Sequence, residues 1–295
     1  MQLKAIGRAA QEIIHLYNKE LAGERAAYMI YRKNPIHTTV NLGAAIVKHS
    51  ADEVLTYKTV CGQQLLLACF YPPDYQQERN YHAVVMIHGG GWSSRKIFDD
   101  QSDWSGDYLG FLARLFAMRG FLALSVDYRL LPNASLADMI EDCRDAVAYI
   151  KQRFELKTLD LLGESAGGYL AAAVDVFSEK PQFRRVILAN PITDLTLDRW
   201  GRFTRNGMKA AAFSPALHVG RQCSPTLLIH GEADTTVSPE HSTRYYAAMQ
   251  DAGILCNLLF LKDTTHAFLL AEYYKDTLAC ETAIDWILKM TLVED

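Results

Sequence analysis

The sequence predicts an α/β fold with a mostly parallel central sheet flanked by helices. From about residue 80, a short apolar run, a Gly-rich or polar turn and an amphipathic segment follow one another repeatedly. The apolar runs, such as HAVVMIH and TLLIHG, have no polar face, which is typical of parallel strands covered on both sides. With 295 residues, 49% hydrophobic and 22% charged, the chain is long enough to form one large domain over residues 1–295.

The N-terminal part differs from this repeated unit. Apolar residues recur at three- and four-residue steps over about residues 4–32 and predict an amphipathic helix, which NPIHTTVNLG interrupts. Residues 1–50 are therefore an N-terminal helical segment and one candidate for a cap. Next, EVLTYKTV and QQLLLACFY are β-like runs separated by Cys61-Gly62, and they predict a hairpin.

The rest of the chain supplies the parallel strands and their helices. The expected strands are HAVVMIH, FLALSVDY, LDLLG, RVILAN, TLLIHG and CNLLFL. The expected helices lie around 107–119, 136–154, from 166, 239–252 and about 271–290. The irregular stretch 191–221 is the second candidate for a small helical cap. In such sheets the working residues gather on the loops at the carboxyl ends of the strands.

Composition excludes several classes of function. The formal charge of −4 gives no basic excess for nucleic acid or an anionic membrane. The six cysteines show neither C-x-x-C nor zinc-type spacing, so we expect no metal site and a reducing, cytoplasmic location. No run reaches the length of a membrane span, and the N-terminus lacks a signal-peptide stretch. We expect a small-molecule partner; whether copies of the chain associate is open.

The turn Gly163-Glu164-Ser165-Ala166-Gly167 matches G-x-S-x-G between an expected strand and an expected helix. Such a turn is strained and lifts the serine hydroxyl clear of the sheet. The helix N-terminus behind it directs the Ala166 N–H toward negative charge forming near Ser165. A Gly-rich turn without chemical consequence is the alternative, and the pattern by itself does not decide between them.

His88-Gly89-Gly90-Gly91-Trp92 follows an expected strand directly. Three glycines leave N–H groups without Cβ atoms, so this backbone can approach a ligand closely and form an oxyanion hole with the Ala166 N–H. A phosphate cradle is a rival, but neither G-x-x-x-x-G-K-[ST] nor G-x-G-x-x-G is present here. A plain tight turn is the other rival. We expect His88 to order the loop by hydrogen bonding rather than to act as a base.

A serine nucleophile needs a general base, and the base needs an orienting acid. Of the nine histidines, His266 alone follows the last expected strand in the loop before the final helix. His82 and His230 instead belong to expected strands, at the wrong end or inside the run. His266 is therefore the predicted base.

Three carboxylates compete for the role of acid. Asp234 follows TLLIHG in a loop that has cleared the sheet, and it is the preferred residue. Glu232 is nearer the strand. Asp263 is close to His266 in sequence, but Thr264-Thr265 between them would force an awkward reversal of the chain.

These motifs together resemble a known family. HGGGW, DYRL, GESAGG, HGEADTTV and THAF, in this order over roughly residues 53–290, resemble the hormone-sensitive-lipase-like branch of α/β-hydrolase carboxylesterases. The resemblance implies an α/β-hydrolase fold with eight strands and a cap, and hydrolysis of short-acyl esters without a cofactor. It implies these roles: Ser165 nucleophile, His266 base, Asp234 acid, and the N–H groups of Gly90, Gly91 and Ala166 as oxyanion donors.

The resemblance also implies supporting residues. His88, Gly89 and Glu164 flank the reacting groups, and Asp127 and Arg129 of DYRL tie loops near the oxyanion turn. Residue 164 is Glu where many members carry Asp, a feature also seen in relatives that act on acetylated sugars or formamides. The segment SLADMIEDC matches the family only loosely.

The predicted activity is that of a serine hydrolase that cleaves short-chain carboxylic esters through an acyl-enzyme. Short acyl chains are expected because the sequence has no long apolar flap. A carbohydrate acetyl esterase or an arylformamidase would use the same machinery, and Trp92, Trp104 and Trp200 can stack on a sugar or serve as core. A non-catalytic small-molecule binding protein is the alternative from another class; the presence of all three triad residues argues against it.

Overall fold

The computed structural model describes residues 40–42, 45–47, 51–93, 108–203 and 209–266, with the single positions 269, 283, 286, 287 and 289. The chain divides into two compact units, Met1–Ser50 and Ala51–Asp295. In the first unit, β1 (Val40–Leu42) pairs antiparallel with β2 (Ala45–Val47). The predicted helix over residues 4–32 lies outside the described residues.

The second unit begins with the predicted hairpin. Strands β3 (Glu53–Val60) and β4 (Gln63–Phe70) pair antiparallel, with a register shift between Thr56 and Lys58. Cys61 and Gly62 join them with φ angles of 51° and 77°. Two consecutive positive φ angles match the twist that a two-residue hairpin loop needs, so this turn sets the register of the pair.

Eight strands form the central sheet in the order β10-β9-β8-β7-β5-β6-β4-β3. Besides the hairpin they are β5 (Ala83–Ile87), β6 (Leu122–Val126), β7 (Asp160–Glu164), β8 (Arg185–Ala189), β9 (Thr226–Gly231) and β10 (Cys256–Leu261). Only the pairings of β4 with β3 and β6 are antiparallel, which confirms the predicted mostly parallel sheet. Because β5 lies between β6 and β7, the chain order reverses there, where ligands bind in open α/β sheets.

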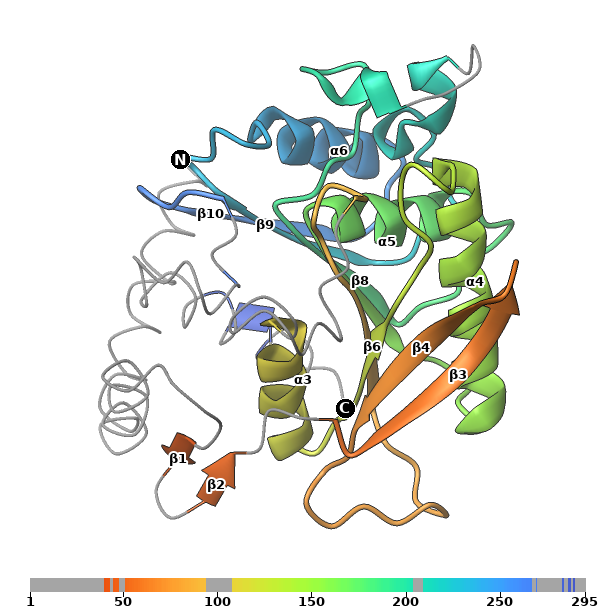
Figure 1. The fold of residues 1–295 in the computed structure, drawn as a ribbon. Coiled ribbons are helices and arrows are strands. Elements are labelled where there is room, and N and C mark those ends of the chain that lie inside the picture. Colours follow the sequence, from red (N-terminus) through yellow and green to blue (C-terminus); the bar gives the residue numbers. More distant parts are fainter. Residues whose placement is uncertain are drawn as a thin grey trace. The chain divides into compact units, whose positions relative to one another are not determined.

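Helices lie on both faces of this sheet. They are α3 (Tyr108–Met118), α4 (Leu136–Arg153), α5 (Ala166–Val176) and α6 (Glu240–Asp251), and α3 lies on the face opposite α4 and α5 (Figure 1). A capping box fixes the start of α4, since Ser135 Oγ accepts the Asp138 N–H and the Asp138 carboxylate accepts the Ser135 N–H. Of the predicted helix at 271–290, only positions 283, 286, 287 and 289 are described, and they are helical.

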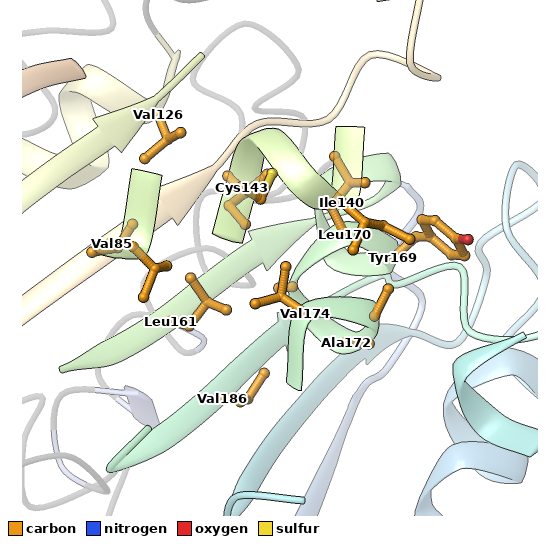
Figure 2. Packing of buried hydrophobic residues seen from close by; sticks show 14 of the residues in the cluster. Val85, Val126, Ile140, Cys143, Leu161, Tyr169, Leu170, Ala172, Val174 and Val186 are labelled. Atoms are coloured by element: carbon orange, nitrogen blue, oxygen red, sulfur yellow. The ribbon is translucent and has the colours of Figure 1, made fainter. Parts of the chain in front are cut away.

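Alternation along the buried strands divides the core into two clusters. In β5, Val85 and Ile87 belong to the cluster on the α4–α5 side, whereas Val84 and Met86 belong to the cluster on the α3 side. Figure 2 shows the first cluster, where Val85, Leu161 and Val186 of three strands face side chains of α4 and α5. Every residue of β5 to β9 is buried, so the strands hold the loops at their ends rigidly.

The candidate cap segment 191–221 combines loops with short turns of helix where it is described. They are η1 (Trp200–Phe203), η2 (Ala210–Phe213) and η3 (Pro215–Leu217), and residues 204–208 lie outside the described part. The rings of Trp200 and Phe203 lie 5.9 and 5.1 Å from that of Trp92, at the end of the glycine loop. Within the described residues, no helix combines the length and apolarity of a membrane span.

Candidate active site

Ser165 lies at the junction of β7 and α5 in an unusual backbone conformation. Its φ of 54° and ψ of −117° are rare for a residue with a side chain, and such strain costs about 1–3 kcal/mol. Neighbouring backbone holds it there, because the Ser165 N–H donates to Ala189 O (2.9 Å) and Ser165 O accepts the Tyr169 N–H (3.1 Å). The serine side chain does not cap α5, so its hydroxyl remains available for other contacts.

The two glycines of the pattern have a steric cause. A Cβ on Gly163 would overlap the Gly167 carbonyl, and a Cβ on Gly167 would overlap the carbonyl oxygens of Ile87 and His88. All of these obstacles are backbone atoms, which cannot rotate away. The close packing of β5, β7 and the first turn of α5 therefore requires glycine at both positions.

The structure brings together the three residues that the sequence selected. His266 Nε2 lies 3.0 Å from Ser165 Oγ, and His266 Nδ1 lies 2.6 Å from Asp234 Oδ2. These residues are 101 and 32 positions apart, and they follow β7, β9 and β10 respectively. Ser165 and Asp234 are buried, and the His266 side chain is 17% exposed. A hydroxyl, an imidazole and a carboxylate thus form one continuous hydrogen-bonded chain.

The Asp234 carboxylate is fixed from several sides. Its Oδ1 accepts the N–H groups of Thr236 (2.8 Å) and Val237 (3.0 Å), and its Oδ2 lies 3.3 Å from His230 Nε2. Burial favours the neutral acid, but hydrogen bonds from His230 and His266 outweigh it and hold the pKa of Asp234 well below its ordinary value. Asp234 is therefore ionised at neutral pH and can orient an imidazole.

The rival carboxylates are placed differently. Glu232 and Asp263 are both exposed, and Asp263 has a φ of 55° in the turn that precedes His266. Neither is among the hydrogen-bond partners of His266 in the described part of the chain. Burial of Asp234 at the centre of its turn is what separates it from them.

Glu164 is a second carboxylate beside His266. It is buried, and its Oε1 lies 3.9 Å from His266 Nε2. Burial lowers the pKa of His266, but the hydrogen bond to Asp234 and the charge of Glu164 more than offset this, so that the pKa lies above its ordinary value. The environment therefore favours an imidazole that has just accepted a proton.

The glycine loop lies against the serine. A Cβ on Gly89 would lie 3.2 Å from Ser165 Cβ and would overlap the Glu164 carboxylate, so the loop passes directly beside the nucleophile turn. Gly90 and Gly91 have φ angles of 96° and 62°, in the region that favours glycine. The sequence-predicted oxyanion donors Gly90 and Gly91 are thus on the loop that borders Ser165, and Ala166 is the residue that follows it.

Aromatic residues hold this loop in place. The Tyr128 hydroxyl donates to His88 O (2.8 Å), and the rings of Tyr128 and His88 stack at 4.3 Å. His88 Nδ1 donates to Gly89 O (2.8 Å), so His88 contacts the loop as a structural donor. Trp92 Nε1 donates to Ala166 O (3.0 Å), which joins the end of the loop to the first turn of α5.

The DYRL residues anchor the next loop to α4. Arg129 Nε and Nη2 bind the two oxygens of Asp142 at 2.7 and 2.8 Å, and Lys58 Nζ binds the same carboxylate at 2.7 Å. Asp127 is buried, and its carbonyl accepts the Tyr57 hydroxyl (2.7 Å). Trp92 and Trp200 are buried in the core, whereas Trp104 lies outside the described residues.

Sequence reasoning missed two contacts near the site. The sequence predicts His230 within a strand, and it does lie in β9, but its position four residues before Asp234 brings the two side chains together. The link from Trp92 to Ala166 was also missed, because it joins residues 74 positions apart. Among the described residues, no three His, Cys, Asp or Glu side chains are arranged to hold a metal ion.

Comparison with protein families identifies the fold. A model named BD-FAE matches residues 69–196, and the model of the prolyl oligopeptidase family matches residues 133–292, more than half of the chain. The chain belongs to the prolyl oligopeptidase family of α/β-hydrolases. The predicted α/β-hydrolase fold is thereby confirmed.

Solved structures similar to this α/β-hydrolase include esterase 2 of Thermogutta terrifontis. Its butyrate-bound form has a TM-score of 0.70 and 27% identity, covering 82% of this chain and 94% of that chain. The same esterase phosphoramylated by tabun has a TM-score of 0.69 and 29% identity, covering 81% and 92%. These likenesses agree with the prediction of a carboxylic ester hydrolase.

Curated relatives of this α/β-hydrolase carry several activities. Kynurenine formamidase of Danio rerio is 24% identical over 206 residues, 64% of this chain and 67% of that protein. The carboxylesterase/phospholipase LipF of Mycobacterium tuberculosis is 44% identical over 62 residues, 20% of this chain and 17% of LipF. The non-reducing polyketide synthase nvfA of Aspergillus novofumigatus is 32% identical over 136 residues, 41% of this chain, and the match spans only 6% of the synthase.

Proposed function

We propose that this protein is a serine esterase that cleaves short-chain carboxylic esters through an acyl-enzyme. The observation that carries the proposal is the hydrogen-bonded chain from Asp234 through His266 to Ser165, at 2.6 and 3.0 Å. These are the groups and distances that nucleophilic catalysis by a serine requires. A binding protein without catalytic function would have no need of this chain of contacts.

In the first step Ser165 attacks the ester carbonyl. The Ser165 Oγ–H donates to His266 Nε2, so the proton moves to the imidazole as the new C–O bond forms. Asp234 stabilises the resulting imidazolium, as does the charge of Glu164. The carbonyl oxygen becomes an oxyanion next to the glycine loop, where the N–H groups of Gly90, Gly91 and Ala166 are the proposed donors.

Collapse of this tetrahedral intermediate breaks the bond to the alcohol. His266 Nε2 returns its proton to the leaving oxygen, so the alcohol departs neutral and Ser165 keeps the acyl group. Water then donates a proton to His266 while its oxygen attacks the acyl carbonyl. The second intermediate expels Ser165 Oγ, which recovers the proton from His266, and the carboxylic acid is released.

Short acyl chains are the proposed substrates. The support is the likeness to an esterase whose solved structures hold propionate and butyrate, at 27% identity over 82% of this chain. We also propose the hormone-sensitive-lipase-like branch as the closer relationship, on the strength of HGGGW and GESAGG at the ends of β5 and β7. If a phylogenetic tree of catalytic-domain sequences placed the chain outside this branch, the assignment to the hormone-sensitive-lipase-like branch would be rejected.

The test combines a fluorophosphonate probe with a series of p-nitrophenyl esters. The wild type should be labelled, and kcat/KM should be highest for acetate to butyrate esters. Ser165→Ala should abolish labelling and lower kcat by about 10⁴ or more. Ser178→Ala, a serine beyond the end of α5, serves as the control and should behave as the wild type. Labelling that persists in Ser165→Ala would reject the nucleophile, and faster cleavage of long-chain esters would reject the substrate class.

A formamidase is the second candidate, because the match to kynurenine formamidase covers 67% of that protein. Hydrolysis of a formamide needs the same nucleophile, base and oxyanion donors, but expels an amine. N-formylkynurenine and an acetylated sugar should therefore be compared with butyrate esters by kcat/KM. A value for N-formylkynurenine well above that for the best ester would replace the first proposal with the second.

We also propose a reducing, cytoplasmic location. Cys61, Cys69, Cys143, Cys223 and Cys256 carry free thiols. Four of the five are buried, which is typical of cysteines that serve as small apolar residues. Fractionation of the producing cells would test the location, and recovery of the protein outside the cytoplasm would reject it.

A further inference from the structure

The fully buried imidazole of His230 lies next to Asp234, the candidate acid. His230 in β9 has its Nε2 3.0 Å from Val237 O and 3.3 Å from Asp234 Oδ2. Its Nδ1 lies 2.7 Å from the hydroxyl of Ser242 in α6. His230 therefore contacts both ends of the turn 234–237 and joins that turn to a helix and a strand.

The partners of His230 determine where its proton lies. A backbone carbonyl only accepts hydrogen bonds, so the contact with Val237 O requires a hydrogen on Nε2. This N–H faces Asp234 Oδ2 as well, and the Ser242 hydroxyl can donate to the unprotonated Nδ1. Asp234 Oδ2 thus faces two imidazole N–H donors, one from His230 and one from His266.

We propose that His230 is a positioning residue for the triad, an inference that rests on the esterase function proposed above. The N–H groups of Thr236 and Val237 fix Oδ1 of Asp234. The His230 N–H faces Oδ2, the oxygen that also accepts from His266, and favours the ionised carboxylate. With both oxygens held, Oδ2 stays in place to accept the His266 Nδ1–H at 2.6 Å. His230 acts on the reaction only through Asp234 and does not touch the reacting atoms.

A purely structural role makes a different prediction. If the imidazole only fills a buried polar gap, its replacement would lower the stability of the protein. The protein that still folds would keep its kcat. A positioning role instead predicts that kcat falls while KM for the ester stays the same, because substrate binding is untouched. The two roles therefore separate in steady-state kinetics of the folded protein.

Two substitutions at this position separate the two ring nitrogens. In His230→Gln the side-chain amide reaches the place of Nε2 and can still donate to Asp234. In His230→Asn the amide reaches only the place of Nδ1 and can bond Ser242 alone. We expect kcat to fall about tenfold or more in His230→Asn. His230→Gln should recover most of that loss, although both variants lose the same ring.

His241→Asn is the matched control. His241 is also fully buried, but its Nδ1 accepts the backbone N–H groups of Thr193 and Asp194, and its Nε2 lies 3.6 Å from the carboxylate of Asp198. Its replacement should lower the melting temperature without lowering kcat. Equal kcat values in His230→Asn, His230→Gln and the wild type would overturn the proposal.

Two further measurements cover other failures. If His230→Asn does not fold, Ser242→Ala is the second variant, because it leaves the ring in place but removes the hydroxyl that faces Nδ1. We expect a severalfold fall in kcat. An unchanged kcat would overturn the proposal.

The downfield proton resonance of His266 Nδ1–H can be followed without any substrate. A wild type that neither hydrolyses esters nor reacts with the probe would reject the esterase function. A resonance that is the same in wild type and His230→Asn would reject the positioning role.

Discussion

The nucleophile turn and the acid–base loops reach the same site by different physical means. Backbone sterics hold Ser165, since Gly163 and Gly167 allow β5, β7 and α5 to pack without side chains between them. Side-chain hydrogen bonds hold Asp234 and His266, which lie on loops after β9 and β10. The first arrangement depends on close packing of backbone atoms from β5, β7 and α5, whereas the second depends on a few polar contacts of side chains.

This difference predicts that stability and activity respond separately to substitution. A side chain added in the nucleophile turn must displace backbone and so destabilises the fold itself. A polar substitution in the acid–base loops changes the direction or the charge of a hydrogen bond while the backbone stays in place. Four substitutions test whether the two regions respond in these different ways.

Asp234→Asn should give the largest effect, a fall in kcat of about 10⁴. The amide oxygen can still accept the N–H groups of Thr236 and Val237, so the turn should keep its shape. The amide group facing His266 donates rather than accepts and favours the wrong tautomer of the imidazole. Steady-state kinetics and a thermal melt of the same preparation test this. A variant that retained a tenth of wild-type activity would show that Asp234 is not the acid.

Gly167→Ala should destabilise the protein by about 3 kcal/mol or more, because the new Cβ overlaps the carbonyls of Ile87 and His88. Gly62→Ala is the control. Its φ is 77°, but nothing lies within 4 Å of the new Cβ, so only the backbone cost of about 1–2 kcal/mol remains. Urea unfolding measures both. Equal losses would show that crowding does not fix the nucleophile turn.

Asp175→Asn tests a contact between α5, the helix that follows Ser165, and the segment before β9, the strand that precedes Asp234. Asp175 near the end of α5 is fully buried, and its carboxylate accepts the N–H (2.9 Å) and the hydroxyl (2.7 Å) of Ser224, just before β9. Burial, only partly offset by these bonds, raises the pKa of Asp175 from 3.8 to about 6. The protonated acid therefore stabilises the fold fully below pH 3.8, and this stability is lost as the pH rises through about 6.

The wild type should lose up to about 3 kcal/mol from this one group between pH 4 and pH 7. Asp175→Asn cannot ionise, so its free energy of unfolding should depend less on pH over that interval. Denaturant unfolding at both pH values measures the difference. Parallel pH dependence of variant and wild type would contradict the assignment.

Glu164→Gln should give the smallest effect, a displacement of the pH profile. His266 must be neutral to accept the serine proton, so kcat/KM falls below the raised pKa of His266. Removing the negative charge 3.9 Å from Nε2 lowers that pKa, and activity should extend to lower pH. The profile of kcat/KM for a butyrate ester measures the shift. An unchanged or upward-shifted acidic limb would exclude this influence of Glu164.

Much of the fold follows from patterns within short stretches. The hairpin at Cys61-Gly62 and strands β5 to β10 lie where apolar runs and turn residues predict them. The pattern Gly163-Glu164-Ser165-Ala166-Gly167 indicates Ser165 because it is contiguous in the sequence, although Gly167 packs against the distant strand β5. Loop position favours Asp234 over Glu232 and Asp263 in the sequence, but only the fold shows that Asp234 is the buried carboxylate.

Apolar periodicity and contiguous motifs extend over only a few residues, so the sequence alone predicts the element order, the turn around Ser165 and the residue types of the site. Tertiary packing sets the position of β5 between β6 and β7, the contact of His230 Nε2 with Asp234, and the approach of Glu164 to His266. The strand order and the approach of Glu164 to His266 involve segments that are far apart in the chain. The contact of His230 with Asp234 depends on how the turn after β9 folds. Packing of the whole sheet is what sets the spacing of its loops.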